Sequence, residues 1–197
     1  MPIGTWEKAQ GILQDGDILL FLAVQGISSA ISWAQWIDGQ EADRYAHAAL
    51  AIDVANDQGY EQNPPSTHYT KLSQQPWDRM EIWRLLPGIK IDPAKLRAYC
   101  AAHLGIGYPF FKYFRFIEAA ALARAGATSA ALAVDSGGSN KADPAWEVCS
   151  ATVCDALDHA KVDPSQVLWT KINDEDERPA DIPLGKVMQI FPPTIPV

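Results

Sequence analysis

The 197 residues are enough for one domain with a sizeable core, since 48% of them are hydrophobic and 20% are charged. The formal net charge of -8 and the lack of any basic run exclude a broad positive surface, so we expect no binding of nucleic acid or anionic lipid. Three cysteines are an odd number, which argues against a disulfide framework and indicates reduced thiols.

The beginning of the chain does not resemble a signal peptide. Residues 1–17 lack the basic stretch and the apolar core that such a peptide contains. The apolar run at 18–24 is far shorter than the ~20 residues that cross a bilayer. We therefore expect no stable membrane insertion and a protein that is cytoplasmic as synthesised, with secretion by another route left open.

The first half of the chain predicts strands separated by turns. An apolar run after a Gly-Asp turn predicts a buried strand at 16–24, and a short helix capped by serine follows at 28–36. A second strand is expected at 45–54 and the start of a third at 60–62, which two prolines then interrupt. After a loop, the alternation of apolar and polar residues predicts a strand at 78–86.

The second half of the chain predicts helices. One helix has Asp92 as its N-cap, Pro93 at its first position and Gly105 just past its end. Residues 114–134 are alanine-rich and helix-prone. We interpret about 114–145 as a helical insertion, because nothing in this stretch indicates a second domain.

The remaining segments complete the assignment of a fold class. The acidic run at 173–181 is predicted to be a solvated surface segment, and the proline-rich end at 191–197 an extended tail. Neither an internal repeat nor a domain linker is evident. Residues 1–197 are therefore predicted to form a single α+β domain, in which helices are interspersed among strands with few parallel crossovers.

Residues 148–160 predict a helix with one inward stripe. At ~100° per residue, the stripe contains Cys149, Thr152, Val153, Ala156, Leu157 and Ala160. Cys154 lies more than ~90° from that stripe, and His159 lies on its flank further along the helix. Ligands on a helix need spacings of three or four residues, so these side chains do not form a metal site.

Cys100 and His103 have such a spacing, but we interpret them as core residues on an apolar stripe. We expect neither a metal nor a cofactor.

Cys149 occupies the first turn of this helix. The unpaired backbone N–H groups and the positive end of the helix dipole stabilise a thiolate at that position. The same groups can stabilise an oxyanion that develops during a reaction. A buried cysteine also occurs as a small apolar residue, so the helix position alone leaves a structural thiol equally open.

A thiol nucleophile needs a histidine within hydrogen-bond reach and usually a third group that orients the imidazole. The chain contains His47, His68, His103 and His159. His47 falls on the strand face that carries Ala49 and Ala51, where small side chains would let a helix end or a substrate approach. A half-exposed strand histidine is the alternative interpretation, and His68 is the competing base.

Five short motifs follow one another in an informative order. They are GDILLF at 16–21, YAHAALAI at 45–52, GYEQNPP at 59–65, GIGYPF at 105–110 and EVCSATVCDAL at 147–157. Their order resembles that of circularly permuted papain-like proteins, the YiiX and YebB relatives in the NlpC-type superfamily, which also includes lecithin retinol acyltransferase-like enzymes. The likeness extends from about residue 16 to the RPADIPL segment at 178–184. It implies a permuted papain-like fold in which an antiparallel sheet packs against helices.

The resemblance also implies roles for individual residues. Cys149 would be the nucleophile, His47 the base and Glu61 the acid that orients the imidazole. The remaining thiol and histidines of the motifs would be structural or incidental, namely Cys154, His103 and His159. The stretch before Cys149 is longer than the family's usual spacer, so the insertion either shapes the cleft or is a peripheral helical hairpin.

The expected strand register does not by itself favour Glu61. A simple hairpin turn after the second strand would place His47 opposite His68, with Glu61 nearer the turn. A bulge or a strong twist could restore the contact. The alternative orienting groups are Gln62 and Asn63.

A thiol hydrolase is the function that the resemblance implies. Cys149 would attack an amide carbonyl of a small peptide or acyl substrate held in a cleft, and the acyl-enzyme would be resolved by water or another acceptor. Cell-wall peptides are one candidate substrate, for an amidase or endopeptidase delivered by a dedicated secretion system. A lipid or acyl-group hydrolase or acyltransferase of the same fold is the alternative.

Two functions without catalysis also stay open. One is a module that binds a small amphiphile in the cleft and has an ordinary thiol. The other is an interaction domain whose Trp33, Trp36 and proline-rich tail face a partner protein. The reactivity of the thiol separates the enzyme from both, because only an activated cysteine alkylates quickly in mild acid.

Overall fold

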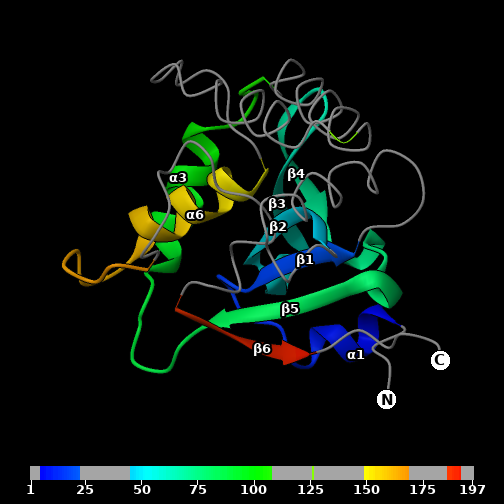
Figure 1. Cartoon of the computed structure of the whole chain (residues 1–197), viewed down its shortest axis with the longest axis horizontal. Coiled ribbons are helices and arrows are strands. Elements are labelled where there is room, and N and C mark those ends of the chain that lie inside the picture. The colour runs from blue at the N-terminus through cyan, green and yellow to red at the C-terminus, as the bar shows by residue number, and fades with distance from the viewer. Residues whose placement is uncertain (1–4, 23–44, 108–125, 127–148, 169–185, 192–197) are drawn as a thin grey trace.

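A computed structural model describes the helices and strands that surround the predicted motifs (Figure 1). In chain order they are α1 (Trp6–Gln10), β1 (Ile18–Leu22), β2 (Tyr45–Asp53), η1 (Val54–Asn56), β3 (Gln58–Asn63), β4 (Ser66–Lys71), η2 (Leu72–Gln74), η3 (Trp77–Arg79), β5 (Met80–Leu85), α3 (Pro93–Ala102), α6 (Cys149–Ala160) and β6 (Val187–Phe191). The residues that the structure describes are 5–22, 45–107, 126, 149–168 and 186–191.

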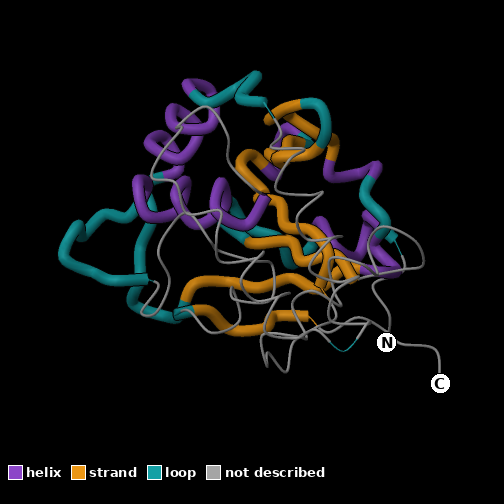
Figure 2. Tube along the Cα trace, turned by 45° about the horizontal axis from the view of Figure 1, so that its top comes forward, coloured by secondary structure: helices purple, strands orange, loops and turns teal. Residues whose placement is uncertain are grey.

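The strands form one antiparallel sheet. Their order across the sheet is β4-β3-β2-β1-β5-β6, and each pair of neighbours is antiparallel. Helices α3 and α6 lie side by side next to the strands, both in Figure 1 and in the turned view of Figure 2. The described part of the chain is therefore α+β, with an antiparallel sheet packed against helices, which confirms the predicted class.

Apolar side chains are buried on both faces of this sheet. Ala48, Leu50 and Ile52 of β2 pack with residues of α3 and α6. Ala49 and Ala51, which alternate with them along the strand, pack in a second cluster. The other buried members of that second cluster are Ala9, Leu13, Leu19, Leu72, Trp77, Met80 and Ile82. The alternation in β2 thus serves two cores, one against the helices and one against the N-terminal segment and the loop before β5.

Helix α3 begins and ends at the predicted signals. The carboxylate of Asp92 accepts hydrogen bonds from the backbone N–H of Ala94 at 2.9 Å and of Lys95 at 3.3 Å. Pro93 is the first helical residue. Gly105 follows the helix with φ +81°, a conformation that residues with a side chain rarely adopt.

The structure corrects the sequence analysis at several elements. It contains α1 in the polar opening, β4 in a predicted loop and β6 before the proline-rich end, none of which the sequence patterns predict. The third strand begins at Gln58 rather than at Tyr60 and continues to Asn63. Pro64 and Pro65 form the turn into β4, and strand pairing resumes directly after them. Proline lacks a backbone N–H, so it interrupts the ladder at a turn without ending the sheet.

Several predicted segments lie outside the described residues. They are the helix at 28–36 with Trp33 and Trp36, the insertion at about 114–145 apart from Gly126, the acidic run at 173–181 and the tail at 192–197. Among the helices that the structure describes, none is long and apolar enough to cross a membrane.

Candidate active site

Cys149 is the first residue of α6. Its side chain is buried, with 7% of the residue exposed, and it is a free thiol. The predicted inward stripe is confirmed, since Thr152, Val153 and Leu157 are all buried. Cys154 is buried too, in the first core cluster, although the helical wheel places it away from the stripe. The reason is that α3 packs against α6 beside the sheet, so α6 is covered on more than one side.

His47 lies in β2, on the strand that α6 crosses. The register pairs it with Phe21 of β1, and the two rings are 5.0 Å apart between centroids. Its side chain is 20% exposed, so the imidazole is largely enclosed but still reaches solvent. Ala49 and Ala51, on the same strand face as His47, are covered by the second core cluster.

The imidazole of His47 contacts the carboxylate of Glu61 in β3. The distance from His47 Nε2 to Glu61 Oε2 is 2.8 Å, and only 7% of Glu61 is exposed. Ala49 is the direct partner of Glu61 in the ladder, so His47 and Glu61 are diagonal neighbours on one face of the sheet. The structure therefore brings together the two residues that the resemblance pairs.

The connection between β2 and β3 explains this register. It contains the short helix η1 and a residue with positive φ, Asp57, rather than a simple two-residue turn. The ladder also shifts between Ala51 and Asp53. The register expected from a simple hairpin is consequently wrong, and His68 faces Glu61 instead of His47.

The alternative orienting groups point elsewhere. Gln62 donates its amide N–H groups to the carbonyl oxygens of Ile106, at 3.3 Å, and Gly107, at 3.1 Å. Asn63 is exposed at the end of β3, beside the turn to β4. Of the three candidates Glu61, Gln62 and Asn63, Glu61 is therefore the one whose side chain contacts the imidazole of His47.

His68 lies on the other side of the same carboxylate. Its Nε2 is 3.4 Å from Glu61 Oε1, and its Nδ1 is 2.8 Å from the carbonyl oxygen of Ser66. The side chain is 42% exposed. The sequence analysis treats His68 as a competing base, because it does not predict β4 and so cannot place this histidine beside Glu61.

Electrostatic coupling links Cys149 to His47. Burial by itself raises the pKa of Cys149, but the charge of His47, a hydrogen bond from His47 and the backbone N–H groups of Ala48 and Ser150 outweigh it and lower the pKa. Burial by itself lowers the pKa of His47, whereas Cys149 and Glu61 raise it to about 10. Both shifts favour a thiolate next to an imidazolium, which is the reactive form of a cysteine–histidine pair.

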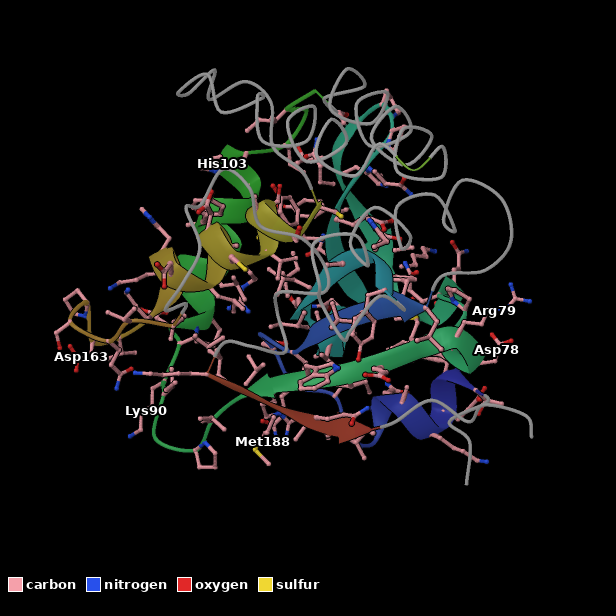
Figure 3. All side chains as sticks on the ribbon, viewed as in Figure 1. Asp78, Arg79, Lys90, His103, Asp163 and Met188 are labelled. Atoms are coloured by element: carbon pink, nitrogen blue, oxygen red, sulfur yellow. The ribbon has the colours of Figure 1, made fainter. Side chains whose placement is uncertain are left out.

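The other cysteines and histidines lie away from this pair. Cys100 is buried among apolar residues, and burial raises the pKa of its thiol to about 12. His103 caps the end of α3, where Figure 3 labels it, and its ring stacks on Tyr99 at 3.8 Å between centroids. His159 is exposed on α6 and its ring is 5.2 Å from that of Tyr99. In the part of the chain that the structure describes, no cluster of three or more potential ligands could hold a metal ion.

Comparisons with known proteins add no family to this geometry. No protein-family model matches the chain, and a search of curated proteins finds no match.

Proposed function

We propose that the protein is a thiol hydrolase in which Cys149 is the nucleophile, His47 the base and Glu61 the group that orients the imidazole. The observation that carries the proposal is the row formed by the three side chains. His47 lowers the pKa of the Cys149 thiol, and its Nε2 contacts Glu61 at 2.8 Å on the other side. Enzymes activate a thiol by placing a base beside the nucleophile and an orienting acid beside the base, which is the order found here.

The first half of the proposed reaction forms an acyl-enzyme. The sulfur of Cys149 attacks the substrate carbonyl carbon, and the carbonyl oxygen takes up the electron pair of its π bond. The backbone N–H of Cys149, at the positive end of the dipole of α6, would help to bind that oxyanion. When the tetrahedral intermediate collapses, the imidazolium of His47 gives its proton to the leaving group as the carbon–nitrogen bond breaks.

The second half releases the acid. Neutral His47 accepts a proton from water, the resulting hydroxide equivalent attacks the thioester carbon, and the carbon–sulfur bond breaks to return the thiolate. Glu61 contributes by holding Nε2 of His47, which leaves Nδ1 as the nitrogen that faces the sulfur.

An amide substrate fits this site better than an ester. An amine leaves only when it is protonated, so an amidase needs a histidine that keeps its proton until the bond breaks. Glu61 supports that role, because its hydrogen bond and charge raise the pKa of His47 independently of the thiolate. We propose small peptides, with cell-wall peptides as the first class to examine, and a permuted papain-like fold of the NlpC type for the chain. Acyl transfer to an acceptor other than water is the alternative outcome of the same acyl-enzyme.

The test is alkylation of each cysteine by iodoacetamide as a function of pH, read by mass spectrometry. An ordinary thiol with a pKa near ~8.5 holds roughly 0.3% thiolate at pH 6. Because the pKa of Cys149 is lowered, the reactive thiolate persists on the acid side of that value, and we expect fast labelling at pH 6. His47→Ala should slow it by at least about tenfold.

Cys100 and Cys154 are internal controls, since both are buried in the first core cluster. Equal labelling of Cys149 in the parent and in His47→Ala would overturn the cysteine–histidine pair and leave the binding module. Fast labelling that depends on His47 would justify a substrate screen with stem peptides and with acyl p-nitrophenyl esters. Preference for the peptides supports the amidase, whereas preference for the esters supports the acyl hydrolase.

A further inference from the structure

We infer that His68 is a positioning residue whose protonation controls how strongly Glu61 supports the Cys149–His47 pair. The inference rests on the proposed function and adds to it a second histidine, from a third strand. Glu61 lies between His47 of β2 and His68 of β4, with one carboxylate oxygen 2.8 Å from the first ring and the other 3.4 Å from the second.

The position of the proton on His68 follows from its contacts. Nδ1 is 2.8 Å from the carbonyl oxygen of Ser66, and a carbonyl oxygen can only accept. Nδ1 therefore carries the hydrogen in this contact. A neutral imidazole has a single N–H, so Nε2 of neutral His68 presents a lone pair to Glu61 Oε1.

The interaction between His68 and Glu61 therefore changes from repulsive to attractive when His68 gains a proton. Neutral His68 cannot donate to the carboxylate, and its lone pair faces a negatively charged oxygen. Protonated His68 donates an N–H from Nε2 and carries a positive charge next to Glu61. Histidine exchanges this proton between about pH 5 and pH 8 in proteins, and the 42% exposure of the side chain lets it equilibrate with solvent.

Among the described residues, Glu61 is the charged group that contacts His68. Glu61 comes from β3, the strand that pairs with β4, and His47 of β2 lies behind it. Thr70, two residues along β4, also hydrogen-bonds the carboxylate. On its outer side, β4 meets backbone groups of the turn after α3, through Gly105 and Ile106, which bring no charge. Within the described residues, a charge on His68 therefore acts on Glu61 and, through the shared carboxylate, on His47.

The direction of the effect follows from charge. A proton on His68 places a second positive charge near His47 and engages one oxygen of the carboxylate that stabilises the His47 imidazolium. Both effects disfavour the imidazolium and, with it, the thiolate of Cys149. Protonated His68 should therefore lower the reactivity of Cys149, and neutral His68 should restore it.

Two variants separate this role from a purely structural one. His68→Asn places an amide N–H near the position of Nδ1, so it can keep the hydrogen bond to Ser66 and never gains a charge. His68→Lys carries a charge throughout the neutral range. The measurement is the rate of iodoacetamide labelling of Cys149 at pH 5.5 and at pH 8, with circular dichroism to verify the fold of each variant.

At pH 5.5 we expect His68→Asn to label about threefold to tenfold faster than the parent, and at pH 8 to match it. His68→Lys should show the opposite, matching the parent at pH 5.5 and labelling about threefold to tenfold more slowly at pH 8. A role in folding alone would give each variant the same ratio to the parent at both pH values, and that result would overturn the inference.

The outcomes distinguish this inference from the proposed function. If labelling of Cys149 does not depend on His47, the proposed hydrolase fails. If it depends on His47 but the ratios of the His68 variants do not change with pH, only the role of His68 fails. Nitrogen-15 NMR of the imidazoles gives an independent reading, because neutral His68 should carry its hydrogen on Nδ1. Finding it on Nε2 would also overturn the inference.

Discussion

Two buried carboxylates, Asp17 directly before β1 and Glu61 in β3, have opposite kinds of partner. Asp17 is 1% exposed and accepts hydrogen bonds from Arg84 at 2.6 Å and 2.7 Å and from the backbone N–H of Gln14 at 2.8 Å. Arg84 also donates to the carbonyl oxygen of Ile12. Burial raises the pKa of Asp17 against the opposing effect of Arg84, but the guanidinium itself keeps its charge throughout the physiological range.

Glu61 has partners that gain and lose protons. His47 contacts one of its oxygens and His68 approaches the other. Burial by itself raises the pKa of Glu61, but the hydrogen bond and charge of His47, together with the charge of His68, lower it. Both carboxylates are buried to a similar degree, so burial does not distinguish them. They differ in their partners, because the histidines beside Glu61 can release a proton and the arginine beside Asp17 does not.

The largest expected effect is a loss of stability when the ion pair of Asp17 and Arg84 is broken. Arg84→Met leaves the carboxylate of Asp17 buried without its cation, and breaking a buried pair in this way costs about 3–5 kcal/mol of unfolding free energy. Urea unfolding at pH 7 measures the loss. Labelling of Cys149 in the folded fraction should stay close to that of the parent, because the pair with Arg84 has no contact with the imidazole.

A double variant is the matched control for that prediction. Asp17→Leu combined with Arg84→Met removes both charges, so it should be more stable than Arg84→Met alone. If Arg84→Met by itself costs less than about 1 kcal/mol of unfolding free energy, the pair behaves like an exposed salt bridge. Asp17 would then not be an example of a carboxylate that stabilises the fold.

Glu61→Gln tests the chemical side and should act mainly on reactivity. The amide removes the negative charge that stabilises the His47 imidazolium, so labelling of Cys149 at pH 6 should fall about tenfold. Because the folded pKa of Glu61 is lowered, its contribution to stability is present above the ordinary carboxyl pKa of ~4.3 and is lost as the pH falls through the folded value. The parent should therefore lose more stability than Glu61→Gln on acidification to about pH 3.

The stability profile is measured by urea unfolding at pH 7 and at pH 3, beside the labelling rates. Thr70→Val is a control in the same place, since it removes a neutral hydrogen bond to Glu61 and leaves the charge. It should change the labelling rate less than Glu61→Gln does. Equal rates for the parent and Glu61→Gln would mean that the carboxylate does not support the imidazole.

Patterns that depend on a single element could be predicted from the sequence. The first-turn position of Cys149 needs only the helical period, and the start of α3 needs only Asp92 followed by Pro93. The alternation in β2 correctly separates Ala48 and Leu50 from Ala49. Each of these signals is written in neighbouring residues, so no knowledge of the partner strand is required.

Relations between elements could not be predicted in the same way. The contact of Glu61 with His47 depends on η1 and on the shift in the ladder, which together move β3 relative to β2. The place of His68 depends on β4, a polar edge strand without a strong apolar alternation. The strand predicted at 45–54 ends at Asp53, and Val54 belongs to η1 and packs against the second cluster. The connection between two strands sets the register of their pairing. A connection that contains a short helix has no simple sequence signature, so this register could not be predicted.

Asp92 supplies the smallest effect and a third use of a carboxylate, with no ion pair to any of the described residues. It accepts hydrogen bonds from two backbone N–H groups at the start of α3. Asp92→Ala should cost about 1 kcal/mol of unfolding free energy, while Asp92→Asn should cost less, because an asparagine side chain also caps a helix. Urea unfolding at pH 7 distinguishes the two, and labelling of Cys149 should not change in either. Equal losses in Asp92→Asn and Asp92→Ala would show that charge rather than hydrogen bonding acts at this cap, because both variants remove the charge and only asparagine keeps an acceptor.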